Sequence, residues 1–217
     1  MCRNITTGVR MRLILIRHGE SEHALRGIIA GFPSCTGLTA RGREQARALA
    51  DRLSVSGELR DVNALLSSPV LRARQTAEVL AGVLPAVSIE EDCDLCELHW
   101  SEAEGMSWEA YRETYGTFDL VTSPSRPVSP GGDSWQDFLS RMRGTLDRLT
   151  ERFDGQTVVA VSHAAFIVAS ILVIFGIPRP GTGARLDPAY TSLTEWCVSG
   201  ATWQLVRYND AYHLLGG

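Results

Sequence analysis

The sequence predicts an α/β protein with an open, mostly parallel sheet, helices on both faces and a helical insertion over one edge of the sheet. The first reason is that short, continuously apolar segments alternate with longer segments whose apolar residues recur at helical spacing. Such alternation is typical of parallel strands joined by helices. The second reason is that residues from about 92 to 154 depart from this pattern, because they are rich in tryptophan, tyrosine and proline.

The composition is that of an ordinary globular protein. Of the 217 residues, 44% are hydrophobic and 21% are charged, and a chain of this length can bury a core without disulfides or metal ions. We therefore expect residues 11–217 to form a single domain that contains the insertion. Residues 1–10 are polar and aperiodic, so we expect a flexible tail there, with Met11 as an alternative start of the chain.

Charge and apolar patterning argue against several classes of function. The formal net charge is −4 at pH 7, and no basic cluster is interleaved with aromatic residues, so we expect no nucleic-acid surface. The longest apolar run, residues 164–177, is interrupted and too short for a membrane span. The five cysteines are scattered and no secretory segment precedes them, which predicts a reducing, cytoplasmic location. The sequence leaves open whether the chain acts alone or as a homodimer.

The first predicted strand covers residues 13–16 and leads directly into a turn. These residues are continuously apolar, as in a strand that is covered on both faces, and the turn contains Arg17 and His18. A helix is then predicted from Thr39, which can cap it, to a stop before Gly57. The first candidate functional residues thus lie at the carboxyl end of a buried strand.

A second buried strand is predicted over residues 62–66. Ser68 and Pro69 have the pattern of an N-cap and a first helical residue, so we predict a helix from there through Leu80. Arg72 would then lie in the first turn of this helix.

The rest of the chain completes the predicted sheet. The insertion returns through a helix that we expect to start near residues 133–134. A third apolar strand, residues 157–161, is followed at once by His163 and a buried helix. Residues 192–198 and 202–208, separated by Ser-Gly-Ala, predict a hairpin at the sheet edge.

Polar residues follow each of the three predicted parallel strands. Arg17 and His18 follow the first strand, Arg72 the second and His163 the third. Ligands of open α/β sheets bind outside the carboxyl ends of the strands. We therefore expect these four side chains to converge on one site, with the insertion over that edge.

This set of residues suits the hydrolysis of a phosphate monoester. Such an ester is dianionic, so a site needs fixed positive charge, an in-line nucleophile and a proton for the leaving oxygen. A neutral imidazole is a competent nucleophile, and cations such as Arg17 and Arg72 would lower the pKa of His18 and keep its ring neutral. Taken alone, a histidine after a strand is more often structural, so the combination carries the argument.

Five segments occur in an order and at intervals that are far more specific together than singly. They are residues 15–21 (Leu-Ile-Arg-His-Gly-Glu-Ser), residues 37–42 (Gly-Leu-Thr-Ala-Arg-Gly), residues 67–77 (Ser-Ser-Pro-Val-Leu-Arg-Ala-Arg-Gln-Thr-Ala), residues 95–97 (Leu-Cys-Glu) ahead of Glu104, and residues 161–163 (Val-Ser-His). In these segments the chain resembles the histidine phosphatase superfamily, in its phosphoglycerate-mutase-like branch, over most of its length.

The resemblance implies a role for each matching residue. His18 would be the nucleophile that is transiently phosphorylated, and Arg17, Arg72 and His163 would surround the phosphoryl oxygens. Glu97 would protonate the leaving group, and we expect burial beside its apolar sequence neighbours to keep its proton in place. The resemblance implies a hydrolase for a small phosphate ester, with no metal and no cofactor.

The chain departs from the family pattern near the expected substrate. Ala24 stands where many relatives have asparagine, Ala30 where many have a polar residue, and Ala164 where glycine usually follows the second histidine. These alanines are candidate substrate contacts, and they make the usual substrate of the family doubtful. His23 and Arg26 either line the substrate mouth or are simply exposed.

Two other functions remain open from the sequence. A phosphoglycerate-type mutase would use the same phosphohistidine but keep the phosphate from water, and a catalytically silent phosphate-binding or interaction protein could use the same fold. Cys93, Cys96 and His99 also resemble half of a zinc or redox site. A structural zinc needs about four ligands, and no second pair follows at a recognisable spacing, so we expect no metal there.

Overall fold

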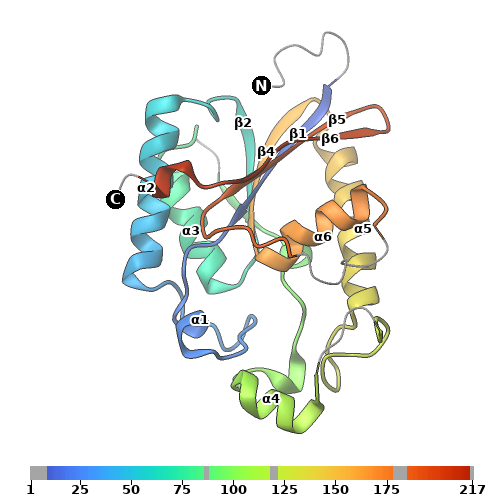
Figure 1. Cartoon of the computed structure of the whole chain (residues 1–217). Coiled ribbons are helices and arrows are strands. Elements are labelled where there is room, and N and C mark those ends of the chain that lie inside the picture. Colours follow the sequence, from blue (N-terminus) through green and yellow to red (C-terminus); the bar gives the residue numbers. More distant parts are fainter. Residues whose placement is uncertain (1–8, 86–87, 118–121, 178–184, 216–217) are drawn as a thin grey trace.

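A computed structural model describes residues 9–85, 88–117, 122–177 and 185–215 (Figure 1). The strands are β1 (Val9–Arg17), β2 (Val62–Ser67), β3 (Ile89–Glu91), β4 (Gln156–Ser162), β5 (Leu193–Ser199) and β6 (Thr202–Asp210). The α-helices are α1 (Glu22–Arg26), α2 (Ala40–Ser56), α3 (Leu71–Ala81), α4 (Trp108–Tyr115), α5 (Trp135–Arg152) and α6 (Ala164–Ile174). Short 3-10 helices are η2 (Cys93–Leu95), η3 (Ser101–Ala103) and η4 (Tyr212–Leu214).

The strands form one open sheet in the order β3-β2-β4-β1-β5-β6. The strands β3, β2, β4 and β1 are parallel, whereas β5 runs antiparallel to β1 and β6 antiparallel to β5. This arrangement confirms the predicted α/β fold with a mostly parallel sheet. The last two strands form the expected hairpin at one edge of the sheet.

Hydrophobic cores lie on both faces of the sheet. Successive side chains of a strand point to opposite faces, so Leu13 and Leu15 of β1 pack in the core under α5 and α6. Ile14 and Ile16 pack in the other core, against α2 and α3. Figure 1 shows these helix pairs on opposite sides of the strands. The unbroken apolar run of β1 therefore reflects burial on both faces.

Local capping residues define α2, as the sequence predicts, and also α5, whose start was predicted near residues 133–134. The Thr39 hydroxyl accepts a hydrogen bond of 2.9 Å from the Gly42 amide at the start of α2. At the start of α5, Ser134 and Asp137 form a reciprocal capping box. In both cases the capping residue and its partner are within four positions of each other, so the pattern can be recognised in the sequence.

Two boundaries differ from the sequence prediction. The helix expected to have Ser68 as its N-cap and Pro69 as its first residue starts at Leu71, with Val70 as its N-cap. The Ser68 hydroxyl accepts a bond from the Val70 amide but also contacts a distant histidine. In addition, β1 begins at Val9, inside the segment expected to be a flexible tail, because its backbone pairs with β5. The remaining residues of that expected tail, 1–8, lie outside the described ranges.

The segment after β1 is hydrogen-bonded to the insertion. The Trp108 amide donates to the carbonyl of Gly27 over 3.0 Å, and the Ile29 amide donates to the carbonyl of Met106 over 2.9 Å. Because of these bonds, α1 and α4 both lie beyond the end of the sheet at which β1 ends (Figure 1). This end of the molecule also receives the carboxyl ends of β2 and β4.

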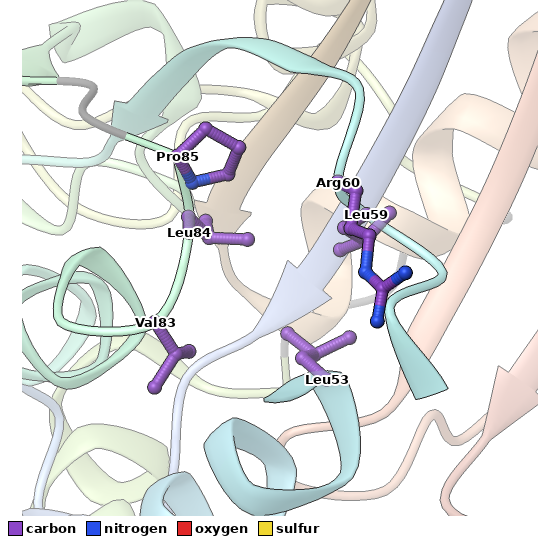
Figure 2. A pocket seen from close by; sticks show the side chains of 6 residues that line it. All are labelled: Leu53, Leu59, Arg60, Val83, Leu84 and Pro85. Atoms are coloured by element: carbon purple, nitrogen blue, oxygen red, sulfur yellow. The ribbon is translucent and has the colours of Figure 1, made fainter. Parts of the chain in front are cut away.

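A separate pocket of about 210 Å³ lies at the opposite end, near the start of β2 (Figure 2). Its lining residues are Leu53, Leu59, Arg60, Val83, Leu84 and Pro85. None of the candidate site residues contributes to it. Among the helices of the described ranges, none has both the length and the apolar character required to cross a membrane.

Candidate active site

The sheet register places the candidate residues beside one another. Arg17 pairs with Ser162 in the parallel ladder between β1 and β4, so His18 and His163 follow at adjacent positions. Their ring centroids are 5.1 Å apart. Arg72, in the first turn of α3 after β2, donates from Nε to Nε2 of His18 over 3.1 Å. The structure thus brings together side chains from three neighbouring strand ends.

Hydrogen bonds fix the orientation of the His18 ring. Nδ1 lies 2.6 Å from the carbonyl oxygen of Gly19, which can only accept, so Nδ1 carries the proton and Nε2 has a lone pair. Burial lowers the pKa of His18 well below its ordinary value, and the charges of Arg72 and Arg17 lower it further. The arginine effect is the one expected from the sequence, but burial is the larger cause. His18 is therefore a neutral imidazole whose Nε2 lone pair accepts from Arg72.

Gly19 allows the turn after β1 to pack closely on α2. A Cβ atom at this position would lie 2.5 Å from the carbonyl oxygen of Gly42. The Gly19 amide also donates to the Thr76 hydroxyl of α3 over 3.1 Å. The residue after His18 is therefore held between two helices with no room for a side chain.

Arg17 is held by the segment that precedes β5. Its Nη1 donates to the carbonyl oxygen of Pro188 over 2.5 Å, and Asp187 lies 3.5 Å away. The guanidinium lies 4.1 Å from the ring centroid of Tyr190, which is in turn 5.9 Å from the ring of His18. The Nε of Arg17 is buried and has no hydrogen-bond partner among the described residues.

Arg72 connects His18 to the segment after α1 and to Glu97. Its Nη1 donates to the carbonyl oxygen of Ala30 over 2.9 Å and lies 3.5 Å from the sulfur of Cys35. Its Nη2 lies 3.6 Å from a carboxylate oxygen of Glu97. The side chain is only 7% exposed, so its charge is poorly screened by solvent.

The surroundings of Glu97 differ from the sequence prediction. Its side chain is 28% exposed, with one oxygen near Arg72 and the other accepting from the Ala165 amide over 2.9 Å. The neighbours Leu95 and Leu98 instead point into the hydrophobic core. The expected apolar burial of the carboxyl was wrong. The side chains of this segment point in different directions, with Leu95 and Leu98 in the core and Glu97 toward Arg72. Its partners in this structure are a guanidinium and an N–H at a helix N-terminus.

Arg141 of α5 holds the backbone segment that carries Glu97. Its guanidinium donates to the carbonyl oxygens of Asp94 (3.1 Å), Cys96 (3.0 Å) and Glu97 (2.9 Å). It also donates to Asp133 over 2.9 Å. One side chain from the insertion therefore determines where the Glu97 backbone lies.

His163 is fully buried, and its two ring nitrogens have different surroundings. Nε2 lies 2.9 Å from the Ser68 hydroxyl, whereas Nδ1 has no hydrogen-bond partner among the described residues. Burial lowers the pKa of His163 well below its ordinary value, with further lowering by Arg72, His18 and Arg17. Both site histidines are therefore neutral.

The candidate substrate residues are distributed unevenly around this site. Ala30 contacts Arg72 through its carbonyl, and Ala164 begins α6 directly after His163. Ala24 and Arg26 are exposed on α1. His23 is buried, and burial is the main cause of its lowered pKa. His23 is therefore not an exposed mouth residue in this structure.

The Cys-x-x-Cys segment has a different environment from that of a metal site. Cys93 is exposed, whereas Cys96 is buried and lies 3.3 Å from the Ser68 hydroxyl. His99 interacts with Asp133, which raises the pKa of His99 to about 9. Within the described ranges, no group of three or more histidine, cysteine, aspartate and glutamate residues could hold a metal ion.

Sequence reasoning missed Tyr190, Arg141 and the contact between Ser68 and His163. The position of Tyr190 follows from the antiparallel pairing of β5 with β1, which brings the start of β5 beside the end of β1. Knowing that pairing would have pointed to the segment before residue 193. For Arg141, the sequence carries no local signal, because its partners lie 8 to 47 residues away.

The fold and site are those of an α/β protein with a positively charged site at the carboxyl ends of parallel strands. Comparison with known proteins identifies its family. The chain belongs to the histidine phosphatase superfamily (branch 1), whose family model matches residues 13–211.

Several known proteins are similar to the chain. A bifunctional protein of Mycobacterium tuberculosis is 32% identical over 200 residues, which cover 90% of this chain and 53% of that protein. The chain thus spans about half the length of this relative. Among solved structures, YhfR of Bacillus stearothermophilus has a TM-score of 0.82 and 26% identity, covering 94% of this chain and 99% of that one. A phosphoserine phosphatase from Entamoeba histolytica in complex with phosphoserine has a TM-score of 0.76 and 28% identity, covering 94% and 100%.

Proposed function

We propose that the chain is a phosphomonoesterase that hydrolyses a small phosphate ester through a phosphohistidine at His18. The observation that carries the proposal is that two buried nitrogen atoms of the site residues have no hydrogen-bond partner in the part of the chain that the structure describes. These atoms are Arg17 Nε and His163 Nδ1, while the unprotonated Nε2 of His18 accepts from Arg72. Buried donors are rarely left unpaired in native proteins. A phosphoryl group would satisfy them.

In the first chemical step, Nε2 of His18 forms a bond to phosphorus as the bond from phosphorus to the ester oxygen breaks. Arg72 now donates to Nε2, so it must turn toward the phosphoryl oxygens when substrate binds. The guanidinium groups of Arg17 and Arg72 and the N–H of His163 stabilise the charge that develops on these oxygens. The Gly19 carbonyl stabilises the positive charge that the ring acquires, because it accepts from Nδ1.

Glu97 would supply the proton for the leaving oxygen. Its carboxylate lies 3.6 Å from Arg72 Nη2 and accepts from the Ala165 amide, so it is held beside the site in which the ester would bind. After proton transfer, the carboxylate can take a proton from water as its oxygen attacks phosphorus. The bond from phosphorus to Nε2 then breaks, and His18 regains its lone pair.

The substrate class follows from the relatives rather than from the catalytic residues. The phosphoserine complex of the Entamoeba histolytica phosphatase supports phosphoserine as the first substrate to test. The alanines Ala24 and Ala30 offer no side-chain hydrogen bond to the far end of a substrate. A substrate with an apolar or aromatic body is therefore the second class to test.

The decisive experiment measures free phosphate from a panel of phosphorylated metabolites and searches for a phosphoenzyme. We expect phosphate release that vanadate inhibits and a chelator leaves unchanged, together with radiolabel on wild-type protein but not on His18→Ala. A phosphoenzyme that persists in His18→Ala would contradict the proposed nucleophile. Conversion of 3-phosphoglycerate to 2-phosphoglycerate without phosphate release, with a trace of 2,3-bisphosphoglycerate present, would show a mutase instead.

A further inference from the structure

We infer that Ser68 is a positioning residue that donates its hydroxyl hydrogen to Nε2 of His163 and so keeps the ring proton on Nδ1. Nδ1 is the ring nitrogen left to donate to a phosphoryl oxygen. This inference rests on the proposed phosphate site, because the direction of the bond matters only if His163 faces an anion. It also accounts for Cys96, whose motif the proposed reaction does not use.

The sheet register brings Ser68 to His163. In the parallel ladder between β2 and β4, Ser67 pairs with Val161, so the residues that follow these two strands lie side by side. The Ser68 amide donates to the carbonyl of Val161 over 3.0 Å, which fixes the backbone at this point. The hydroxyl then lies 2.9 Å from Nε2 of His163. The pairing of these side chains is therefore built into the ends of two central strands.

The Ser68 hydroxyl has one hydrogen to donate and lone pairs for two donors. The Val70 amide donates to it over 3.3 Å, which occupies one lone pair. The sulfur of Cys96 lies 3.3 Å away and could be either donor or acceptor. Because sulfur is a weak acceptor and an imidazole nitrogen is a strong one, the hydroxyl hydrogen is better placed on the bond to His163.

Cys96 then completes the set by donating its thiol hydrogen to Ser68. The sulfur and the hydroxyl oxygen are 3.3 Å apart, and the hydroxyl hydrogen is already used on His163, so the thiol is the group left to donate between them. The donors then run in one direction, from Cys96 through Ser68 to His163.

The opposite direction would be unfavourable for an anion site. If Nε2 of His163 donated to Ser68, the neutral ring would present the lone pair of Nδ1 to the phosphoryl oxygens, which would repel it. Ser68 and His163 are both 0% exposed and Cys96 is 4% exposed. Water therefore cannot replace a hydrogen bond that these buried groups lose, so the unfavourable arrangement would be costly. Burial and nearby arginines lower the pKa of His163. The ring is therefore neutral and has one proton, which is on either Nδ1 or Nε2.

The direct test is nuclear magnetic resonance of the ring nitrogens in the ¹⁵N-labelled protein at pH 7, with His163 assigned by comparison with His163→Gln. Long-range correlations between ring protons and nitrogens distinguish the tautomers. We expect a neutral ring with its proton on Nδ1. A proton on Nε2, or on both nitrogens, would overturn the inference even if the enzyme hydrolyses phosphate esters.

Variants provide the second measurement. Ser68→Ala should populate the Nε2–H tautomer, weaken vanadate inhibition and lower kcat by about 10- to 100-fold, as expected when a preorganised donor is weakened. Ser68→Thr, which keeps a hydroxyl, should restore the Nδ1–H tautomer. The matched control is Ser67→Ala, because Ser67 is equally buried but donates to a backbone carbonyl over 2.8 Å. An unchanged tautomer in Ser68→Ala would overturn the inference.

The two proposals fail in different ways. If wild-type protein has the Nδ1–H tautomer and Ser68→Ala loses it, the positioning role of Ser68 is supported whatever the substrate. If that same wild-type protein neither binds vanadate nor releases phosphate from the panel, the proposed function is wrong. Should Ser68→Ala fail to fold, the tautomer of the wild-type ring still decides the inference.

Discussion

Replacing Arg141 by methionine tests how the structure positions Glu97. Methionine keeps much of the length of the arginine side chain but removes all of its donors. Arg141 makes hydrogen bonds to the carbonyl oxygens of Asp94, Cys96 and Glu97 and to Asp133. Each such bond contributes about 0.5–1.5 kcal/mol net. Because the side chain is 16% exposed and water can replace part of the loss, we expect destabilisation of about 2–3 kcal/mol.

The effect on activity should depend on the leaving group. General acid catalysis contributes about 10²–10⁴-fold, and it matters most when the leaving oxygen is strongly basic. If Arg141 keeps Glu97 in place, Arg141→Met should lower kcat for phosphoserine by about 100-fold but kcat for p-nitrophenyl phosphate by less than about 10-fold. Vanadate inhibition should change less than kcat for phosphoserine, because the hydrogen bonds of Arg141 go to Asp133 and to the backbone before and at Glu97, and its charge acts on His163 only from a distance.

The assay compares both substrates at saturation, with unfolding by urea measured in parallel. The matched control is Arg143→Met, since Arg143 is exposed on the same helix and should affect neither activity nor stability by more than about 0.5 kcal/mol. Equal losses on both substrates would refute the reasoning, because they would show that Arg141 acts on the phosphate site and not on the acid.

Other predictions address the remaining site residues. Tyr190→Leu should weaken vanadate inhibition about 2- to 30-fold, the range of a cation–π contact, whereas Tyr190→Phe should not; equal effects would contradict the contact. Gly19→Ala should destabilise the fold by about 1–3 kcal/mol by overpacking, whereas Gly144→Ala, which has open space, should stabilise it by about 0.5–1 kcal/mol in urea unfolding. Since His18 and His163 have lowered pKa values, the unfolded chain binds more protons below about pH 6.5. The free energy of unfolding should therefore fall from pH 7 to pH 5, by up to about 1.4 kcal/mol per pH unit for each ring. The urea midpoint should fall with it, and a constant midpoint would contradict this.

Much of the fold follows from contacts between residues close in sequence. The apolar runs predict β1, β2 and β4, because a strand buried on both faces has no polar side to interrupt it. The caps at Thr39 and Ser134 depend on hydrogen bonds within four residues. The convergence of His18 and His163 also follows from the sequence, because parallel strands place their carboxyl ends at one edge of the sheet.

The sequence alone predicted other features less well. Ser68 has the pattern of an N-cap, yet its hydroxyl lies against His163, 95 residues away. Glu97 was expected in apolar surroundings because of Leu95 and Leu98, but those side chains point into the core and the carboxylate lies near Arg72. In an irregular segment, which lacks the periodicity of a helix or strand, the sequence does not show which side chains face the core.

The sequence by itself therefore determined the parallel sheet, the helices that its caps mark and the edge at which the candidate site residues meet. Only the tertiary structure decided which atoms of those side chains have partners. It showed that Tyr190 lies against Arg17, that Arg141 holds the backbone of Glu97, and that Nδ1 of His163 is left without a partner among the described residues. The physical reason is that caps and apolar periodicity arise from short-range contacts, whereas hydrogen-bond partners in a buried site come from segments that only the packed sheet brings together.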